Sequence, residues 1–149
     1  MPILVDADAC PRAIKAIIFK AADRTKTATL LVANQMLQTP PSPYIRAIQV
    51  PSGFDVADNE IVQRVQLGDL VITADIPLAA QIVAKGATGL TPRGEFYTPE
   101  TVAVALSLRN FMQTLRDTGT LTGGPSPQQA RDLRLFAQAL DAWLAKNAS

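Results

Sequence analysis

The sequence predicts a three-layer α/β fold with a mostly parallel sheet flanked by helices. Short apolar runs alternate along the first 95 or so residues with segments in which apolar residues recur every three or four positions. The runs are typical of strands buried in a parallel sheet, and the second spacing is typical of helices that pack one face on a core. With 149 residues, 48% hydrophobic and 18% charged, the chain is expected to fold as one domain, residues 1–149.

Three strands and one helix are predicted in the first third of the chain. The strands are expected at residues 3–5, 29–33 and 47–50, each a short apolar run. Pro11 is expected to open the helix between the first two strands, because its fixed φ suits the first helical position. The apolar residues of this helix share one face: Ile14, Ile17, Ile18, Ala21 and Ala22. Three prolines predict that residues 34–44 form a loop.

The next segments repeat the alternation of helix and strand. A helix is expected after Gly53, with Ile61, Val62 and Val65 directed inward. Residues 70–73 form the clearest strand pattern of the chain. A further helix carries Leu78, Ala79, Ile82 and Val83 on one face, and residues 87–91 are expected to form a fifth strand. The α/β core is therefore predicted to span residues 1–95 approximately.

Two helices are predicted at the end of the chain, within residues 98–147, and both are expected to pack on the core. Thr98, Pro99 and Glu100 have the order of an N-cap, a first-turn proline and a first-turn acid. The apolar positions expected to face inward are Val104, Leu108, Met112 and Leu115 in the first helix, and Leu133, Phe136, Leu140 and Trp143 in the second. Gly119 is expected to end the first helix. Thr122–Pro125 then reads as a loop, and Ser126–Gln129 as a capping box.

Four aspartates follow predicted strands or lie in the first turn of a helix: Asp6, Asp8, Asp58 and Asp75. Ligands of open parallel sheets bind at the carboxyl ends of the strands where strand order reverses, so these carboxylates are expected to converge there. The chain has no histidine, which excludes Ser-His-Asp and Cys-His chemistry and imidazole metal ligands. Carboxylates instead favour hard cations, so the four aspartates are predicted to bind Mg²⁺ or Mn²⁺. Asp6, Asp58 and Asp75 are the predicted catalytic residues.

Each of these aspartates also has a purely structural explanation. Asp8 and Asp75 can cap helices, and Asp55 and Asp58 have the spacing of an N-cap and an acidic residue in the first turn. A cap at Asp8, however, does not require a second carboxylate at Asp6. Asp69 precedes its strand, so it is expected at the opposite edge of the sheet as a turn residue.

Cys10 is the single cysteine, which excludes an intramolecular disulfide and a cysteine-based zinc site. A helix N-terminus lowers the pKa of a thiol, so Cys10 has the position of a nucleophile. Nearby carboxylates raise that pKa and there is no histidine to act as a base. A structural role is therefore predicted for this residue.

Several polar residues are predicted to support the acidic site. The expected phosphate- or substrate-binding residues are Arg12, Lys15, Asn34 and Arg93, and the residues expected to support the metal ligands are Asn59 and Thr73. Arg93 lies between Pro92 and Gly94, so a rigid loop is expected to present its guanidinium group to phosphate.

Seven stretches resemble the YaiI/YqxD family of uncharacterised bacterial proteins. They are VDADACP at 5–11, LVAN at 31–34, PSP at 41–43, PSGFDVADNE at 51–60, LVITADIPLA at 70–79, PRG at 92–94 and TGGP at 122–125. The resemblance implies a PIN-like fold, the architecture of many metal-dependent ribonucleases. Compared with PIN-like proteins, Asp6 and Asp75 resemble the carboxylates at the strand ends, and Asp58 resembles the acidic residue of a middle helix.

The leading prediction is therefore a Mg²⁺- or Mn²⁺-dependent phosphodiesterase acting on RNA or single-stranded nucleic acid. One alternative is a haloacid-dehalogenase-type phosphatase, because Asp6 and Asp8 follow the first strand. Another is a non-catalytic module that binds nucleotide, RNA or a protein. Residues 1–6 do not begin a signal peptide and no apolar run reaches the length of a membrane span, so a cytoplasmic location without membrane contact is expected. The oligomeric state is left open.

Overall fold

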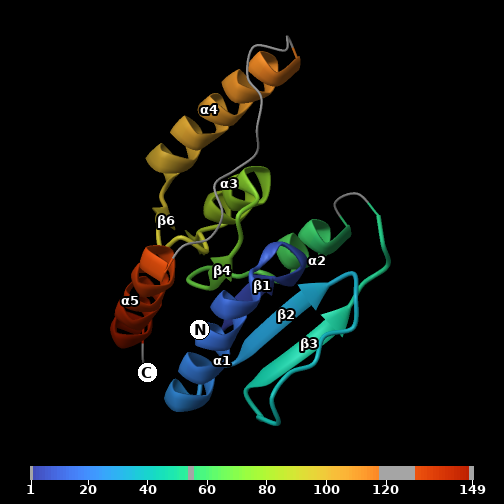
Figure 1. Ribbon diagram of the computed structural model, residues 1–149, viewed down its shortest axis with the longest axis vertical. Helices are drawn as coiled ribbons and strands as arrows, with labels where there is room; N and C mark the ends of the chain where they lie inside the picture. The colour runs from blue at the N-terminus through green and yellow to red at the C-terminus, as the bar shows by residue number, and fades with distance from the viewer. Residues whose placement is uncertain (1, 54–55, 118–129, 148–149) are drawn as a thin grey trace.

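The structure, a computed structural model, describes residues 2–53, 56–117 and 130–147 (Figure 1). A six-stranded sheet with the order β3-β2-β1-β4-β5-β6 forms its centre. Strands β1 to β5 are parallel, and the edge strand β6 is antiparallel to β5. The strands are β1 (Ile3–Asp6), β2 (Thr29–Ala33), β3 (Ile45–Gln49), β4 (Leu70–Ile72), β5 (Thr88–Leu90) and β6 (Phe96–Tyr97).

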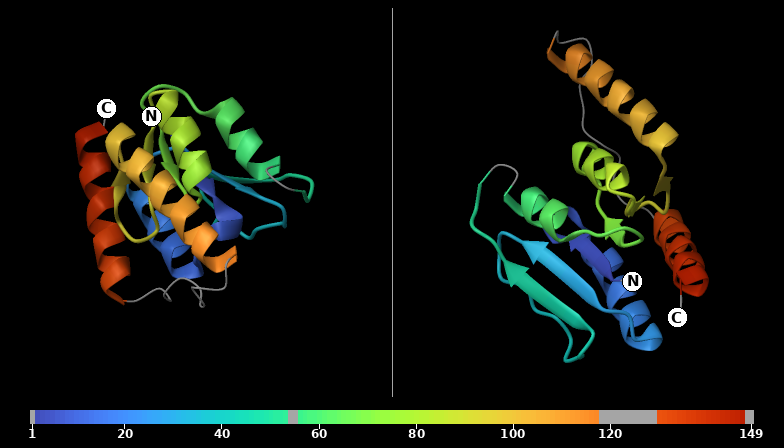
Figure 2. Two further views of the ribbon diagram at one scale, coloured as in Figure 1. Left: turned by 90° about the horizontal axis from the view of Figure 1, so that it is seen from above. Right: turned by 180° about the vertical axis from the view of Figure 1, so that it is seen from behind.

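Helices cover both faces of the sheet, as the sequence predicts (Figure 2). They are the 3₁₀ turn η1 (Ala7–Ala9) and the helices α1 (Arg12–Thr25), α2 (Val56–Arg64), α3 (Ile76–Ala84), α4 (Pro99–Asp117) and α5 (Ala130–Asn147). Helices α1 and α5 supply the core on one face, whereas α2 and α3 supply it on the other. The three-layer, mostly parallel α/β fold is confirmed.

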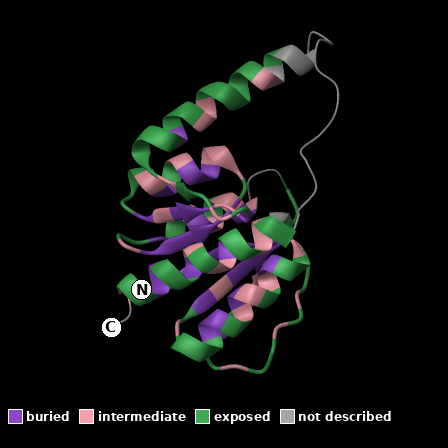
Figure 3. Ribbon diagram, turned by 60° about the vertical axis from the view of Figure 1, so that its left-hand side comes forward, coloured by how far each residue is buried: buried purple, intermediate pink, exposed green. Residues whose placement is uncertain are grey.

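The alternation of side chains along β1 builds the two halves of the core. Ile3 and Val5 belong to the cluster under α1 and α5, and Leu4 belongs to the cluster under α2 and α3. Successive strand residues point to opposite faces, so a strand covered on both sides must be apolar at every position. Figure 3 shows the buried residues concentrated in the sheet and on the helix faces that touch it.

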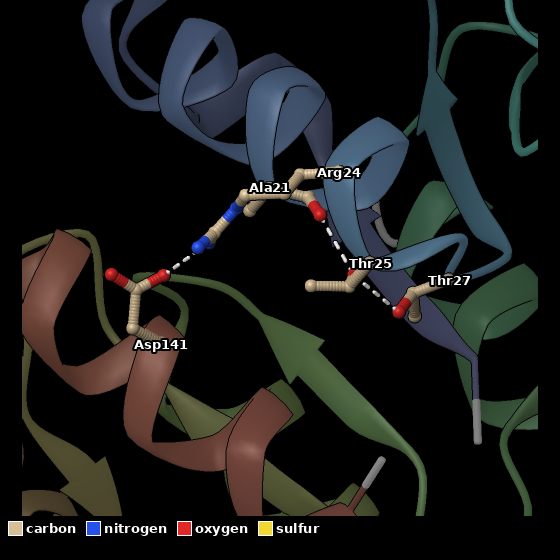
Figure 4. Close-up of polar contacts among 5 residues, drawn as sticks. All are labelled: Ala21, Arg24, Thr25, Thr27 and Asp141. Atoms are coloured by element: carbon tan, nitrogen blue, oxygen red, sulfur yellow. Dashed lines mark hydrogen bonds and ion pairs between the residues drawn. The ribbon is translucent and has the colours of Figure 1, made fainter. Parts of the chain in front are cut away.

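Helix α5 packs on α1 through its apolar side chains. Phe136, Leu140, Trp143 and Leu144 are buried in the same cluster as Ile14 and Ile18 of α1. The Arg24 guanidinium also lies 2.7 Å from an Asp141 carboxylate oxygen, but both side chains are more than half exposed (Figure 4). An exposed ion pair of this kind contributes only about 0–1 kcal/mol. Apolar burial, rather than the ion pair, therefore holds α5 in place.

The turn between β5 and β6 rests directly on the backbone of α5. The Thr91 amide donates to the Glu95 carbonyl at 2.8 Å, and the Gly94 amide donates to the Thr91 carbonyl at 3.0 Å. Gly94 has a φ of +88°, and a Cβ added there would lie 2.5 Å from the carbonyl carbon of Leu135. This position therefore requires glycine for two independent reasons, the backbone conformation and the close approach.

Helix α4 differs from its prediction in the face that it buries. Val104 and Leu108 were expected to face the core, but they are 68% and 57% exposed. The side of α4 that carries buried Val102 and half-buried Leu106 is more covered, and the helix packs against α3 and β6. Both faces have apolar residues at helical spacing, so periodicity alone could not distinguish them.

Other differences are local. Strand β3 begins two residues before the predicted 47–50 strand, and strand β6 was not predicted. β6 has two residues, too few to show the period of a strand. Gly119 and the predicted loop and capping box at residues 122–129 lie outside the described residues.

Candidate functional site

The central strand β1 marks the point where strand order reverses. Its parallel neighbours are β2 on one side and β4 on the other; the chain runs from β1 to β2 and from β4 to β5, so the two connections lead in opposite directions. Open α/β sheets bind ligands at the carboxyl end of such a point. Asp6 is the last residue of β1, and Thr73 and Asp75 directly follow β4. The predicted strand-end positions are therefore adjacent in the fold.

A hydrogen-bonded chain links the ends of β1 and β4. The Thr73 hydroxyl donates to the Asp6 carboxylate at 3.0 Å and accepts from the Asp75 amide at 2.9 Å. Asp6 and Thr73 are both buried, with 6% and 1% of their surfaces exposed. Thr73 thereby fixes the distance between the two strand ends and the direction of the Asp6 carboxylate. Whether it supports a metal ligand stays a prediction.

Electrostatics place two other carboxylates near Asp6. Burial raises the pKa of Asp6 above its ordinary value of 3.8, and the negative charges of Asp75 and Asp8 raise it further, whereas the hydrogen bond from Thr73 lowers it. Like charges shift a pKa in this way only at short range. Asp75 and Asp8 therefore both lie within electrostatic reach of Asp6.

Asp6→Asn is expected to stabilise the metal-free protein increasingly as pH rises. In the wild type the pKa of Asp6 is raised in the folded state. The stability contributed by this group is therefore complete in acid and is lost as pH rises through the folded-state pKa. Asparagine keeps an oxygen that accepts from Thr73 but carries no charge.

Urea unfolding of the two proteins with a metal chelator, at several values between pH 4 and pH 8, measures this difference. Asp141→Asn, which removes one carboxylate at an exposed site on α5, is the control for the loss of one negative charge. A difference between Asp6→Asn and wild type that does not change with pH would contradict the electrostatic explanation.

Three of the aspartates have hydrogen bonds that give them a structural role: Asp75, Asp8 and Asp69. Asp75 caps α3, because its carboxylate accepts from the Leu78 amide at 3.0 Å. Asp8 instead accepts from the backbone amide of Asn34 at 2.7 Å, which ties η1 to the segment after β2. Asp69 is buried and accepts from the Gln66 amide at 2.9 Å, as expected of a turn residue. The cap uses one oxygen of the Asp75 carboxylate, so the other oxygen can coordinate a cation.

The remaining predicted residues lie in α2, in the segment after β2 and in the turn between β5 and β6. Asp58 lies half-buried in the first turn of α2, and the neighbouring Asn59 is exposed. The amide oxygen of Asn34 is buried and accepts no hydrogen bond within the described part of the chain. Arg93 is exposed in the turn between β5 and β6. Their roles as ligands or phosphate contacts stay predictions.

Arg12 and Lys15 line a surface pocket of about 490 Å³ between α1 and residues 36–38. Both residues were predicted to bind phosphate. They lie on adjacent positions of one helix face, because residues three apart are neighbours in an α-helix.

Tyr97 is a residue of this region that sequence reasoning missed. It is half-buried, and its pKa is raised first by burial and then by the charges of Glu95 and Asp75. Its ring lies against Gly89, where an added Cβ would be 2.9 Å from a ring carbon. The turn signal of Gly94 followed by Phe96 and Tyr97 could have indicated a short hairpin at this place.

Cys10 is buried, with 7% of its surface exposed. Burial raises its pKa to about 12, against a smaller lowering by the positive charge of Lys15. A thiol that stays protonated at neutral pH is a poor nucleophile. The structure therefore supports the predicted structural role.

The donor chemistry of this edge fits a hard divalent cation. Among the described residues no three acidic, histidine or cysteine side chains are grouped closely enough to hold a metal ion by themselves. Mg²⁺, however, commonly binds through one or two carboxylates and keeps several water molecules. Asp6 and Asp75 are the pair best placed for this, because Thr73 joins their strand ends.

The sheet order, the two helical layers and the acidic strand ends define an α/β protein with a PIN-like fold. The family described as "Uncharacterized BCR, YaiI/YqxD family" matches residues 4–146, so the chain belongs to this family. Proteins named "UPF0178 protein" from Pectobacterium carotovorum and Yersinia pestis are each 60% identical over 144 residues, covering 97% of this chain and 96% and 95% of theirs. No solved structure matches the chain. In the described part of the chain, no helix has the length and apolarity needed to cross a membrane.

Proposed function

We propose that this protein is a Mg²⁺- or Mn²⁺-dependent phosphodiesterase that acts on RNA or another single-stranded nucleic acid. The observation that carries the proposal is the Asp6–Thr73–Asp75 connection across the point where strand order reverses. It joins the Asp6 carboxylate to the backbone amide of Asp75, so two aspartates from distant parts of the sequence lie at the edge where parallel sheets bind ligands. Burial is the main cause of the raised pKa of Asp6, and the negative charges of Asp75 and Asp8 raise it further, so a cation bound here would favour the charged carboxylate.

The roles of the residues follow from their positions. Asp6 and Asp75 would hold the cation, with Asp8 and Asp58 contributing directly or through water. When bound, such an ion activates water as a nucleophile and offsets negative charge on the phosphate. Thr73 would keep the Asp6 carboxylate in one direction by donating to one of its oxygens. Arg93 and Lys15 would bind phosphate groups on either side of the reacting one.

A non-catalytic binding module is the second candidate, and two contacts favour it. The Asp75 carboxylate caps α3, and the Asp8 carboxylate accepts from the Asn34 amide, so each already has a structural task. The phosphatase alternative is less favoured, because its nucleophile would be Asp6, whose carboxylate is buried and whose pKa is raised.

Calorimetric titration with Mn²⁺ tests the proposal. The wild-type protein is expected to bind Mn²⁺, and Asp75→Asn is expected to bind it at least about tenfold more weakly, because a coordinating oxygen is lost. Asparagine is as good an N-cap as aspartate, so α3 should be retained in the variant. Asp141→Asn is the control for the loss of one negative charge.

Equal Mn²⁺ affinity in the wild type and Asp75→Asn would place any bound cation elsewhere and contradict the proposed site. Labelled single-stranded RNA and DNA should then be incubated with the wild type under the conditions of Mn²⁺ binding. Tight oligonucleotide binding with no cleavage would favour the non-catalytic module.

A further inference from the structure

A pocket of about 490 Å³ lies between α1 and the segment that follows β2, the strand next to β1. One wall is α1 and the other is the segment that follows β2. The residues that give the pocket its character are Arg12, Lys15, Phe19, Met36, Leu37 and Gln38. Its volume is within the range of pockets that hold small organic ligands.

The two walls of the pocket are tied together at the acidic site. The Asp8 carboxylate in η1 accepts from the Asn34 amide at 2.7 Å, and η1 leads into α1 whereas Asn34 leads to Met36. The Asp8–Asn34 contact therefore lies between the pocket walls and the end of β1 in the chain.

The lining combines positive charge with apolar surface. Arg12 and Lys15 present two cationic groups from one helix face, and none of the described residues that line the pocket is acidic. Phe19 and Leu37 provide apolar surface that is partly buried, and Met36 is 83% exposed. Gln38 can donate and accept hydrogen bonds. An anion that also carries a flat apolar group matches this lining.

We propose that this pocket binds one nucleotide of a single-stranded nucleic acid. Its phosphate contacts Arg12 and Lys15, and its base lies on Met36 and Phe19. The next phosphate along the strand is then directed past the Asp8–Asn34 contact toward the Asp6–Asp75 edge. The choice of ligand rests on the proposed function, but binding in the pocket requires neither metal nor cleavage. Single strands fit better than duplexes, because only an unpaired base exposes its face to a side chain.

Fluorescence anisotropy with labelled eight-nucleotide oligo(U) and oligo(dT), measured with a metal chelator, tests the pocket. Arg12→Ala/Lys15→Ala is expected to weaken binding at least about tenfold at low salt and to reduce the slope of log K against log salt by about 1.4, which corresponds to two single-strand phosphate contacts. Lys20→Ala/Arg46→Ala removes the same two charge types from exposed positions on α1 and β3. This control should retain the affinity and slope of the wild type.

Met36→Ala separates the base contact from the charge contact. Its side chain is exposed, so the variant should fold, and it is expected to bind the oligonucleotide more weakly with an unchanged salt slope. Unchanged affinity in Met36→Ala would overturn the base contact. Equal losses in the two double variants would overturn the pocket. Competition by poly-glutamate as strong as that by oligonucleotide, or tighter binding of a duplex, would overturn a single-stranded nucleic acid as the ligand.

The outcomes for the pocket and for the proposed function are distinct. If wild type cleaves RNA but Arg12→Ala/Lys15→Ala binds like the control, the pocket proposal fails and the phosphodiesterase proposal stands. If no cleavage is found with any metal but the double variant loses binding, the pocket stands in a protein that only binds its ligand. Tighter binding of oligo(U) than of oligo(dT) would identify RNA as the preferred strand.

Discussion

Asp6→Asn is expected to reduce Mn²⁺-dependent cleavage of a single-stranded oligonucleotide by about 10²–10³-fold or more. Charge stabilisation by a catalytic cation is worth several kcal/mol, and each 1.36 kcal/mol corresponds to a factor of ten in rate. Asp6 lies at the carboxyl end of the central strand and accepts a hydrogen bond from Thr73. Asparagine preserves that acceptor but replaces the charged oxygen pair that would hold the cation.

The cleavage rate should be measured at saturating Mn²⁺ so that weaker metal binding does not account for the whole loss. Circular dichroism and urea unfolding should show that Asp6→Asn is folded and at least as stable as the wild type. Asp69→Asn is the matched control for the loss of a buried carboxylate. Asp69 is also buried, but it accepts a hydrogen bond in the turn before β4, away from the proposed site, so this variant should keep its cleavage activity. Cleavage by purified Asp6→Asn at the wild-type rate would eliminate the proposed mechanism.

Gly94→Ala is expected to lower the free energy of unfolding by about 2–5 kcal/mol, the sum of backbone strain and overpacking. The φ of +88° disfavours any residue with a Cβ, and the added carbon would lie 2.5 Å from the carbonyl carbon and 2.7 Å from the carbonyl oxygen of Leu135. Neither partner is a flexible side chain. The turn must therefore move away from α5, or the helix must shift.

Gly86→Ala is the matched control for backbone strain. Gly86 has the same φ of +88°, but the atom nearest to its added Cβ is in the side chain of Leu67, which is 80% exposed and can rotate away. Chemical denaturation of both variants should show a larger loss for Gly94→Ala. Equal losses would mean that the contact between the turn and α5 contributes little.

Much of the fold could be predicted because the local patterns agree with the final packing. The run Leu70–Ile72 is apolar at each position, and β4 is covered on both faces. The helix face with Ile14, Ile18, Ala21 and Ala22 is buried as expected. A segment with a single apolar face can bury only that face, so its buried residues can be predicted from the sequence.

The details of the site depended on contacts that the sequence does not encode locally. The strand-end positions of Asp6 and Asp75 could be predicted, but the pairing of β1 with β4 and the Thr73 hydroxyl between them depend on the folded sheet. The contact between Asp8 and the Asn34 amide joins residues 26 apart. Helix α4 has two apolar faces, and only tertiary packing decides which is covered.

The central position of β1 has a consequence for how the protein is made. β1 precedes the other described strands in the chain, and the hydrogen bond between Asp6 and Thr73 joins residues 67 apart in sequence. Closing so long a loop is slow relative to forming a helix. The nascent chain can therefore form α1 early. The hydrogen bond between Asp6 and Thr73 can form only after β4 has been synthesised and has paired with β1. Any metal or nucleic acid that binds this edge consequently recognises a chain that has already completed the middle of its sheet.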